Sequence, residues 1–571
     1  MERATVRRLV LDGWPLLVAG VLLLPLLTRP GIPLARDLVF VPRQPWTDAV
    51  LGLGDTAPRA VPLDALVSLA TSVVDGGVLA RLVLPLVLAT AGWGAHRLVR
   101  DLGTPARLAA GGLAVWNPFV VERLALGQWA LLAAYAALPW VGMAAARFRR
   151  SGRLADLAAV ALWAALASLT PTGGLLAVAT VLVLGTDSLG LAARLAPVVM
   201  VLQLPWLVPA LTGSAGLTSD PAGVAAFAAR AEGPGGVVAA VVGLGGIWDA
   251  GSVPGTRETW WGTTTALVVL VAVAVGGRHL WRTWGSSDAT RWAALAAGGL
   301  LLALASGTGV GADALRWAVE AVPGAGLLRD SQKLAAPYAV VAVAAVAAML
   351  HLALVQANRW GIEVGAACAV TAVAVPVLLL PDATGTVWPT VDPVEASPDL
   401  DAVAALVDGT DRDLATLPWR SYRRFDGGSD LVSSDPAVRW FDTGVLVADD
   451  LAVGDLAVAG ESARGAAVGR ALDAASPARV LPGLGVGWVL VYLDDPDVDE
   501  LDLAGLTEEY AGADLALYSV PGVDDAPDDP DRARRWGVVL ADLLAGLLVV
   551  AAAVASITSR KRQRRRFPVV R

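Results

Sequence analysis

The chain has 571 residues, of which 56% are hydrophobic and only 17% are charged, and its formal net charge is −8. Soluble globular chains carry about a quarter charged residues, so this composition excludes an ordinary soluble enzyme and indicates an integral membrane protein. With a single cysteine, Cys368, the chain cannot form an intrachain disulfide, and with only three histidines beside it a Cys/His metal cluster is excluded as well.

Several stretches are apolar on every face and long enough, at about 17–25 residues, to cross the hydrocarbon of a bilayer as helices. They predict a polytopic α-helical membrane protein with about twelve transmembrane helices. In chain order these are expected at residues 9–27, 78–98, 108–121, 129–146, 154–169, 173–189 and 195–211, between residue 261 and the segment GGRHLWR, at 292–306, over two helices that include 335–350 and 362–380, and at 538–557.

Arginine-rich segments fix the expected orientation of these helices. They lie at 97–107, 147–153, 278–282 and in the tail 560–567. With twelve crossings, all four fall on one side of the membrane, and short cytoplasmic segments are the ones enriched in Lys and Arg. The sequence therefore predicts a plasma-membrane protein with both termini in the cytoplasm.

Acidic residues concentrate in one block. Residues 382–535 contain 31 Asp and Glu against 11 Arg, which indicates a separate water-exposed domain and argues against nucleic acid as a partner. We expect a transmembrane core over 1–381 with a long first outer loop (28–77), an extracytoplasmic α/β domain over 382–535, and a final helix with a basic tail over 536–571. In the domain, strands are expected at 413–417, 487–493 and 515–520, and helices at 464–474 and 503–510.

Two outer segments carry carboxylates close to the expected membrane surface. Asp37 follows the first helix by about ten residues, in the segment ARDLVFVPRQPW. Glu122 and Arg123 are expected in a short turn between two helices, flanked by Trp116 and Trp129. A loop aspartate and an exposed ion pair are the alternative readings, and an exposed pair contributes less than about 1 kcal/mol.

A third outer segment, GLLRDSQKLAAPY, places Arg329 and Lys333 at the start of a helix. If that helix begins early, the two cations share one face because they are four residues apart. Cations on the outer face run against the usual charge bias of membrane proteins. They are suited to holding a lipid phosphate, with headgroup anchoring as the alternative.

Together these features resemble the GT-C type of membrane glycosyltransferases, which use polyprenyl-phosphate sugars. The resemblance rests on Asp37 in the long first outer loop, on Glu122 in the second, and on a polytopic core followed by an outer domain. The segment RDSQK also looks like the Arg-Asn-x-x-Lys segment of the large mycobacterial arabinofuranosyltransferases. Stretches such as NPFVVERLALGQW and LGVGWVLVY look like actinobacterial membrane proteins of this type.

The resemblance implies a reaction and roles for these residues. Asp37 and Glu122 would be catalytic, while Arg329, Lys333 and Arg123 would bind the donor phosphate. The partners would be a polyprenyl-phosphate sugar, a cell-envelope glycan, lipid or protein acceptor, and the surrounding membrane lipids. Many such enzymes carry two acids in the first loop, whereas here Arg36 precedes Asp37, so the cofactor stays unknown and a divalent cation stays open.

Two other functions fit the same topology. A transporter or lipid-linked sugar flippase would also have twelve helices with both ends inside. However, the loop after the second helix lacks the Gly-x-x-x-Asp-Arg-x-Gly pattern expected of the major facilitator plan, and the outer domain breaks its two-half symmetry. A non-catalytic scaffold for envelope assembly is the third alternative, with the acidic domain binding a partner.

Overall fold

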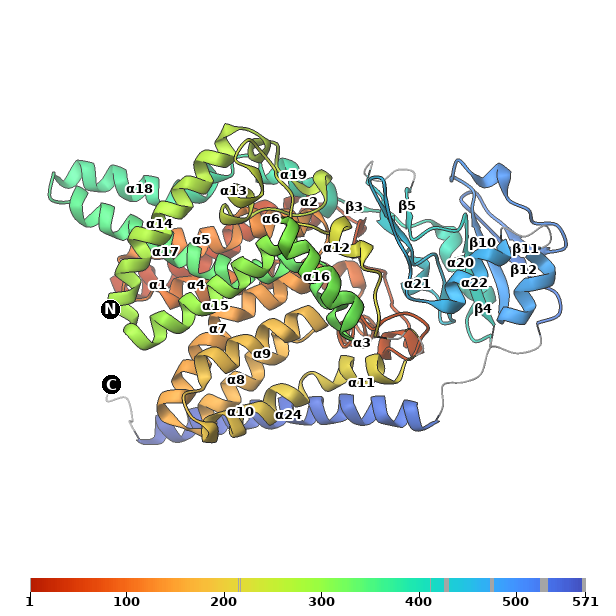
Figure 1. Ribbon diagram of the computed structural model, residues 1–571, viewed down its shortest axis with the longest axis horizontal. Coiled ribbons are helices and arrows are strands. Elements are labelled where there is room, and N and C mark those ends of the chain that lie inside the picture. Colours follow the sequence, from red (N-terminus) through yellow and green to blue (C-terminus); the bar gives the residue numbers. More distant parts are fainter. Residues whose placement is uncertain are drawn as a thin grey trace.

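The structure, a computed structural model, describes residues 2–213, 215, 217–410, 412–425, 431–472, 477–523 and 532–566. Figure 1 shows a helical bundle with a smaller α/β domain at one end of it. Helix α1 begins, and the long helix α24 (Arg532–Arg566) ends, at the end of the bundle farthest from that domain. Residues 567–571 of the expected basic tail lie outside the described residues.

The bundle helices begin and end where local sequence signals predict. Thr170, Ser188 and Thr259 each accept a backbone N–H bond at a helix start, which satisfies one of the free donors there. The helices are α1 (Glu2–Leu22), α2 (Leu24–Thr28), α3 (Leu63–Thr71), α4 (Gly76–Leu98), α5 (Thr104–Val115), α6 (Pro118–Ala125), α7 (Trp129–Ser151), α8 (Leu154–Ala167), α9 (Pro171–Gly185), α10 (Leu189–Val201), α11 (Leu204–Thr212), α12 (Ala222–Ala226), α13 (Gly236–Val242), α14 (Trp260–Trp284), α15 (Ser286–Ala305), α16 (Gly309–Ala321), α17 (Ala336–Ala357), α18 (Ile362–Leu379) and α19 (Ala383–Val391).

Six helices of the described chain are long and apolar enough to cross a membrane, namely α4, α7, α14, α17 with the turn before it, α18 and α24. The number rises to eight if two bent pairs are single spans, α10 with α11 at 64° and α15 with α16 at 92°. Helices α8 and α9 are apolar but shorter. The expectation of a helical membrane protein is thus confirmed, while the number of twelve spans stays a prediction.

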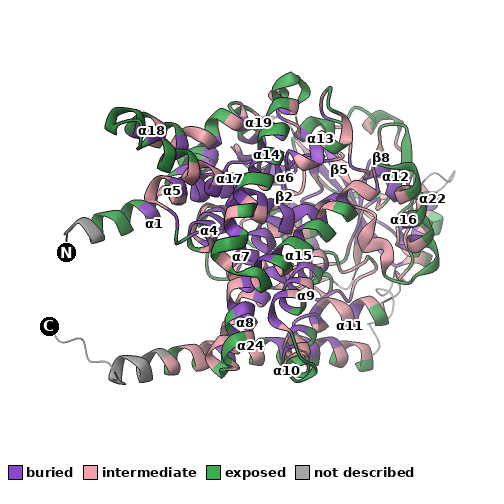
Figure 2. Cartoon of the chain, turned by 60° about the vertical axis from the view of Figure 1, so that its left-hand side comes forward, coloured by how far each residue is buried: buried purple, intermediate pink, exposed green. Residues whose placement is uncertain are grey.

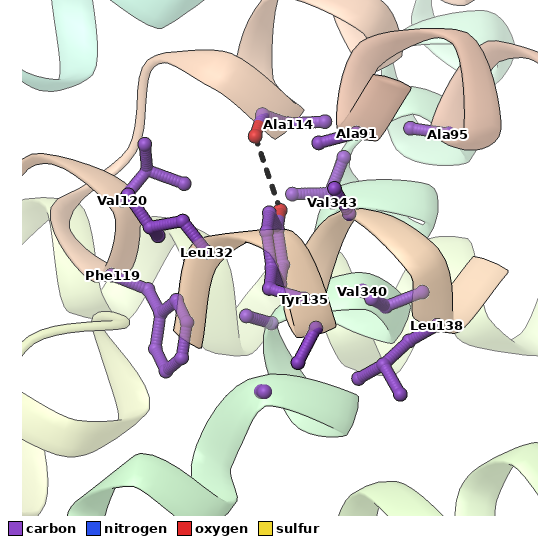
Figure 3. Packing of buried hydrophobic residues seen from close by; sticks show 14 of the residues in the cluster. Ala91, Ala95, Ala114, Phe119, Val120, Leu132, Tyr135, Leu138, Val340 and Val343 are labelled. Atoms are coloured by element: carbon purple, nitrogen blue, oxygen red, sulfur yellow. Dashed lines mark hydrogen bonds between the residues drawn. The ribbon is translucent and has the colours of Figure 1, made fainter. Parts of the chain in front are cut away.

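Helix α7 lies at the centre of the bundle, and its small residues let neighbouring helices approach closely. Its Tyr135 hydroxyl donates a 3.2 Å hydrogen bond to the Ala114 carbonyl of α5 (Figure 3). A buried hydroxyl needs such an acceptor because the bilayer interior supplies none. Figure 2 shows buried residues gathered where α4, α7, α15 and α17 meet. Helices α18 and α24 instead expose apolar residues such as Val370 and Leu547, as lipid-facing helices do.

The α/β domain is built on a five-stranded sheet with strand order β11-β12-β10-β4-β7. Strand β10 pairs parallel with β4 and antiparallel with β12, and all seven of its residues are buried, as expected for the apolar run VGWVLVY. The domain elements are β3 (Pro393–Val394), α20 (Pro398–Val407), β4 (Asp413–Leu417), β5 (Tyr422–Arg423), β6 (Ser433–Ser434), α21 (Ala437–Trp440), β7 (Val445–Leu446), β8 (Leu451–Val453), β9 (Leu456–Val458), α22 (Ala463–Leu472), α23 (Pro477–Val480), β10 (Val486–Tyr492), β11 (Thr507–Ala511) and β12 (Leu515–Ser519).

The expected strands at 413–417, 487–493 and 515–520 are confirmed as β4, β10 and β12. The helix expected at 464–474 is confirmed as α22 up to Leu472, and residues 473 and 474 lie outside the described residues. The helix expected at 503–510 is wrong, because this segment contains strand β11. Strand β11 pairs antiparallel with β12 across a short turn that contains Gly512. The ladder formed with β12 outweighs the helical propensity of the segment LTEEY.

The segment 28–77, predicted to be the first outer loop and named so below, joins the bundle to the α/β domain. Strand β1 (Ile32–Ala35) pairs with β2 (Leu38–Val39) and with β3 of the domain. Ile32 and Leu34 belong to the same buried cluster as Leu400 and Trp488 of the domain. Helix α19 follows the boundary expected at 382 but still packs on α6 of the bundle. The two parts are therefore connected by buried apolar contacts as well as by the chain.

Candidate functional site

A cavity of about 490 Å³ lies where the bundle meets the α/β domain, and both parts line it. Helices α7 and α11 contribute Leu131 and Trp206, while the domain contributes Tyr422, Arg439 and Glu461. The lining combines apolar surface with converging charged groups. Such a cavity fits a ligand that has an apolar part and a charged part.

Asp37, expected to be the catalytic carboxylate, lines this cavity from the turn between β1 and β2. Its N–H donates to the Leu126 carbonyl at 3.2 Å. Gly127, with φ of +86°, lies so close to the Asp37 backbone that an added Cβ would be only 2.7 Å from the Asp37 carbonyl carbon. Only glycine fits this approach, so the loop between α6 and α7 fixes the backbone of Asp37.

The α/β domain holds the same turn through its own backbone. The Arg36 N–H donates to the Val432 carbonyl at 2.7 Å, and the Arg36 carbonyl accepts the Ser434 N–H at 2.8 Å. Arg36 itself has φ of +54°, in the left-handed region that residues other than glycine rarely adopt. Its guanidinium binds Asp249 and Ser252 of the bundle. Asp37 is therefore positioned by two segments far apart in the sequence.

The environment of the Asp37 carboxyl makes it a stronger base than a solvated aspartate. Burial raises its pKa, and the hydrogen bond from the Tyr422 hydroxyl, at 2.7 Å to Oδ1, offsets only part of that effect. The charges of Lys333 and Arg439 also favour the ionised form. A half-buried carboxylate with a raised pKa in a cavity is typical of a general base.

Arg329 and Lys333 both line the cavity as well. The expectation that they share one face of a helix is wrong, because α17 begins only at Ala336 and both residues precede it in separate short turns. The Lys333 ammonium pairs with Asp330 at 2.6 Å, and Arg329 pairs with Glu461 at 3.0 Å. Tertiary folding, and not helical spacing, brings the two cations to one cavity.

Glu122 and Arg123 do not line the cavity. They belong to helix α6, which Asn117 caps, and not to the expected turn, and both side chains are fully buried. The alternative reading as an exposed ion pair is therefore wrong. The Arg123 guanidinium donates to the Gln332 carbonyl at 3.4 Å, directly beside Lys333 in the chain. These two residues thus lie behind the cavity wall that carries Lys333.

Glu122 is part of a buried charge network with Glu232 and Arg257. Glu232 pairs with Arg257 at 2.6 Å, and the Ile247 N–H donates to Glu122 at 3.3 Å. An added Cβ on Gly245 would lie 2.5 Å from carboxylate oxygens of both glutamates, so the two carboxylates are close neighbours. Burial and the charge of Glu232 raise the pKa of Glu122. The network ties the segment 232–257 to α6.

Several polar residues of the cavity were not predicted from the sequence, among them Arg59, Tyr422, Arg439 and Glu461. Tyr422 lies 385 residues from Asp37 in the chain, and its segment has no unusual composition. No local signal could have identified it. Arg59 stands in the first outer loop, but an arginine in a polar loop predicts nothing by itself.

Within the described ranges, no group of three or more His, Cys, Asp or Glu side chains could hold a metal ion. The acids of the cavity are paired otherwise: Asp37 with Tyr422, Asp64 with Arg439, Asp330 with Lys333, and Glu461 with two arginines. Positive charge toward an anionic ligand would come from the Arg and Lys side chains.

No protein-family model and no curated protein matches the sequence. In fold, the chain is similar to the arabinofuranosyltransferase AftD from mycobacteria, with 18% sequence identity and a TM-score of 0.53 over 90% of this chain and 40% of that one. A mutant form of the same enzyme gives 17% identity and a TM-score of 0.53 over 90% and 42%. The chain thus spans about two fifths of the length of the enzyme that it matches. The resemblance to arabinofuranosyltransferases is confirmed at the level of the fold.

Proposed function

We propose that the protein is a membrane glycosyltransferase of the GT-C type, which moves a sugar from a polyprenyl-phosphate donor to a cell-envelope glycan, lipid or protein acceptor on the outer face. The observation that carries the proposal is the shared cavity, in which the half-buried carboxylate of Asp37 faces the same space as Arg329 and Lys333. Sugar transfer from a lipid phosphate needs both chemistries, a base for the acceptor hydroxyl and cations for the departing phosphate.

In this reaction Asp37 takes the proton of the acceptor hydroxyl as its oxygen attacks the anomeric carbon of the donor sugar. The bond between that carbon and the phosphate oxygen breaks, and polyprenyl phosphate leaves with the bonding electrons. Arg329 and Lys333 stabilise the charge that develops on the phosphate. Tyr422 holds the carboxylate toward the cavity through its 2.7 Å hydrogen bond.

Glu122 and Arg123 act in the proposal as positioning residues. Both are buried behind the cavity, and Arg123 binds the carbonyl of Gln332 next to Lys333. A contact of Arg123 with the donor phosphate, which the resemblance implies, would require the guanidinium to leave this buried site. The buried residues of α6 therefore support Lys333 through the backbone carbonyl of Gln332.

The apolar part of the cavity suits the lipid chain of the donor. Leu131 and Trp206 line it from helices α7 and α11, and α11 follows the 64° bend after α10. A lipid-linked donor reaches such a site through the bilayer, so no nucleotide-binding fold is needed. The fold similarity to an arabinofuranosyltransferase supports glycosyl transfer as the reaction.

Asp37→Asn tests the proposal, because asparagine keeps the size of the side chain but removes the base. We expect normal expression, intact donor binding and a fall in the transfer rate of about 10²–10⁴-fold. Asp313→Asn, the same change at an exposed aspartate of α16, is the matched control. An unchanged rate for Asp37→Asn overturns the assignment of the base. If the wild type consumes no polyprenyl-phosphate sugar but moves it between leaflets of vesicles, the protein is a flippase; if it does neither, the scaffold reading remains.

The proposed orientation places both termini in the cytoplasm and residues 382–535 outside the plasma membrane. Its support is that α1 begins, and α24 ends, at the end of the bundle away from the α/β domain (Figure 1). Single-cysteine variants on a Cys368→Ser background test it. A membrane-impermeant maleimide added to intact cells should label Asp455→Cys and not Ser151→Cys, both of which are exposed sites. Labelling of both, or of Ser151→Cys alone, contradicts the orientation.

A further inference from the structure

Two arginines of the cavity converge on one carboxylate. Arg59 of the first outer loop pairs with Glu461 at 2.8 Å, and Arg329 pairs with the other oxygen of the same carboxylate at 3.0 Å. The Ser219 hydroxyl donates a third bond, at 2.9 Å. Arg59, Arg329, Ser219 and Glu461 all line the cavity that holds Asp37. The bundle supplies the three donors, and the α/β domain supplies the acceptor.

The arrangement has the form of an occupied anion site. Burial opposes ionisation of Glu461, but the two guanidinium groups outweigh it and lower the pKa, so the group is an anion at neutral pH. Burial and the charge of the neighbouring Arg59 lower the pKa of Arg329, whereas the charge of Glu461 acts in the opposite direction. Guanidinium groups bind carboxylate and phosphate oxygens with the same paired geometry.

We propose that Arg59 and Arg329 form the seat for the phosphate of the lipid donor, and that Glu461 occupies this seat in the empty protein and leaves it when the phosphate binds. The inference rests on the proposed function, since it takes the ligand to be a polyprenyl phosphate. It assigns a ligand-binding role to Arg59 and a competing, self-blocking role to a residue of the α/β domain.

The surroundings of Glu461 allow its side chain to move while its backbone stays in place. The backbone N–H groups of Glu461 and Ser462 both donate to Asp449 at 2.7 Å, which anchors the loop within the domain. The preceding hairpin packs through Val458 on Phe227 of the bundle. In the proposal, a change of the Glu461 side-chain rotamer frees the seat. The Arg59 side chain is 58% exposed, which leaves the seat open to an incoming ligand on that side.

The structural alternative is that the three charges only clamp the domain to the bundle. The two readings differ in what removal of the carboxylate charge does to phosphate binding. If Glu461 competes with phosphate, removing its charge leaves the seat free, so Glu461→Gln should bind phosphate more tightly. If Glu461 only clamps the α/β domain to the bundle, removing its charge loosens the contact between them, so Glu461→Gln should bind phosphate no better and should unfold more easily.

The test measures binding of a long-chain polyprenyl phosphate, and of the matching polyprenol, to the full-length protein in nanodiscs. We expect Glu461→Gln to tighten polyprenyl phosphate binding about tenfold and Arg59→Met to weaken it about tenfold, since a hydrogen bond to a charged group corresponds to such a factor or more. Polyprenol binding should not change in either variant. Glu320→Gln, the same change at an exposed glutamate of α16, should behave as the wild type.

Two binding results overturn the proposal, and a competition result overturns its assignment of the donor. One is that Glu461→Gln binds polyprenyl phosphate no more tightly than the wild type. The other is that Arg59→Met, which does not depend on removing Glu461, leaves phosphate binding unchanged. Phosphatidic acid added as a competitor should displace the probe poorly, and equal competition assigns the seat to phospholipid headgroups and refutes the donor assignment.

Sugar transfer is measured separately, so the two ideas fail independently. If Glu461→Gln tightens phosphate binding while the wild type transfers no sugar, the seat stands and the transferase fails. If the wild type transfers sugar but neither Glu461→Gln nor Arg59→Met changes phosphate binding, the proposed transferase function is kept and the proposed phosphate seat is refuted.

Discussion

Replacing Tyr422 by phenylalanine would show whether the α/β domain tunes the carboxylate in the cavity. The Tyr422 hydroxyl donates to Asp37 Oδ1 at 2.7 Å, and burial leaves the pKa of Asp37 raised in spite of this bond. The hydroxyl donor favours the ionised carboxylate. Its removal therefore raises the pKa of Asp37 further, while the phenylalanine ring keeps the shape of the site.

The size of the effect follows from the kind of bond that is lost. A hydrogen bond to a charged group contributes about 1.5–3 kcal/mol, so the ionised fraction of Asp37 should fall by about ten- to a hundredfold at low pH. A general base works only when ionised. The transfer rate of Tyr422→Phe should therefore fall by this factor on the acid side of the profile. At high pH, where Asp37 is ionised in both proteins, the two rates should converge.

The assay is kcat/KM for sugar transfer against pH, for purified wild type and variant. Tyr510→Phe is the matched control, because the Tyr510 hydroxyl also donates to an aspartate, Asp399 at 2.8 Å, but does not line the cavity. Its profile should match the wild type. An acid limb of Tyr422→Phe that overlays the wild type refutes the coupling to Asp37. A loss of equal size at every pH would instead indicate a role in folding or packing.

Three further predictions test the supports of the site. Arg257→Met should destabilise the protein by about 3–5 kcal/mol, because it leaves buried carboxylates without their cation. Arg316→Met removes the cation of an exposed ion pair and should change stability by less than about 1 kcal/mol. Thermal unfolding in detergent measures both variants, and equal effects would contradict the reasoning. Gly127→Ala should reduce both the stability and the rate of sugar transfer, because the added Cβ meets the backbone of the Asp37 turn. Gly236 also has a positive φ, but a Cβ added there meets no neighbouring atom, so Gly236→Ala should lose about 1 kcal/mol of stability and no activity. Lys333→Met should raise the KM for donor more than it alters unfolding, and an unchanged KM would remove this lysine from the donor site.

The sequence by itself determined the class of the protein and much of its secondary structure. Long runs that are apolar on every face, such as 538–557, indicate membrane helices without knowledge of any contact, because the bilayer is their solvent. The acidic block marked the separate α/β domain. Strand β10 was predictable because VGWVLVY is apolar at every position, as a strand covered on both faces must be. Asp37 stood out as an acid soon after the first helix, and Arg329 and Lys333 stood out because cations are less common on the outer face of a membrane protein.

Tertiary structure decided what these residues do together. Glu122 was expected as a catalytic acid in a short outer turn, with an exposed ion pair as the alternative, but it is buried beside Glu232 and Arg257, which come from a segment more than a hundred residues later. Tyr422 reaches Asp37 across 385 residues because the first outer loop forms strands that join the core of the α/β domain. Local patterns report hydropathy and periodicity, whereas a binding site depends on distances between distant segments. Those distances are set by the packing of the whole chain.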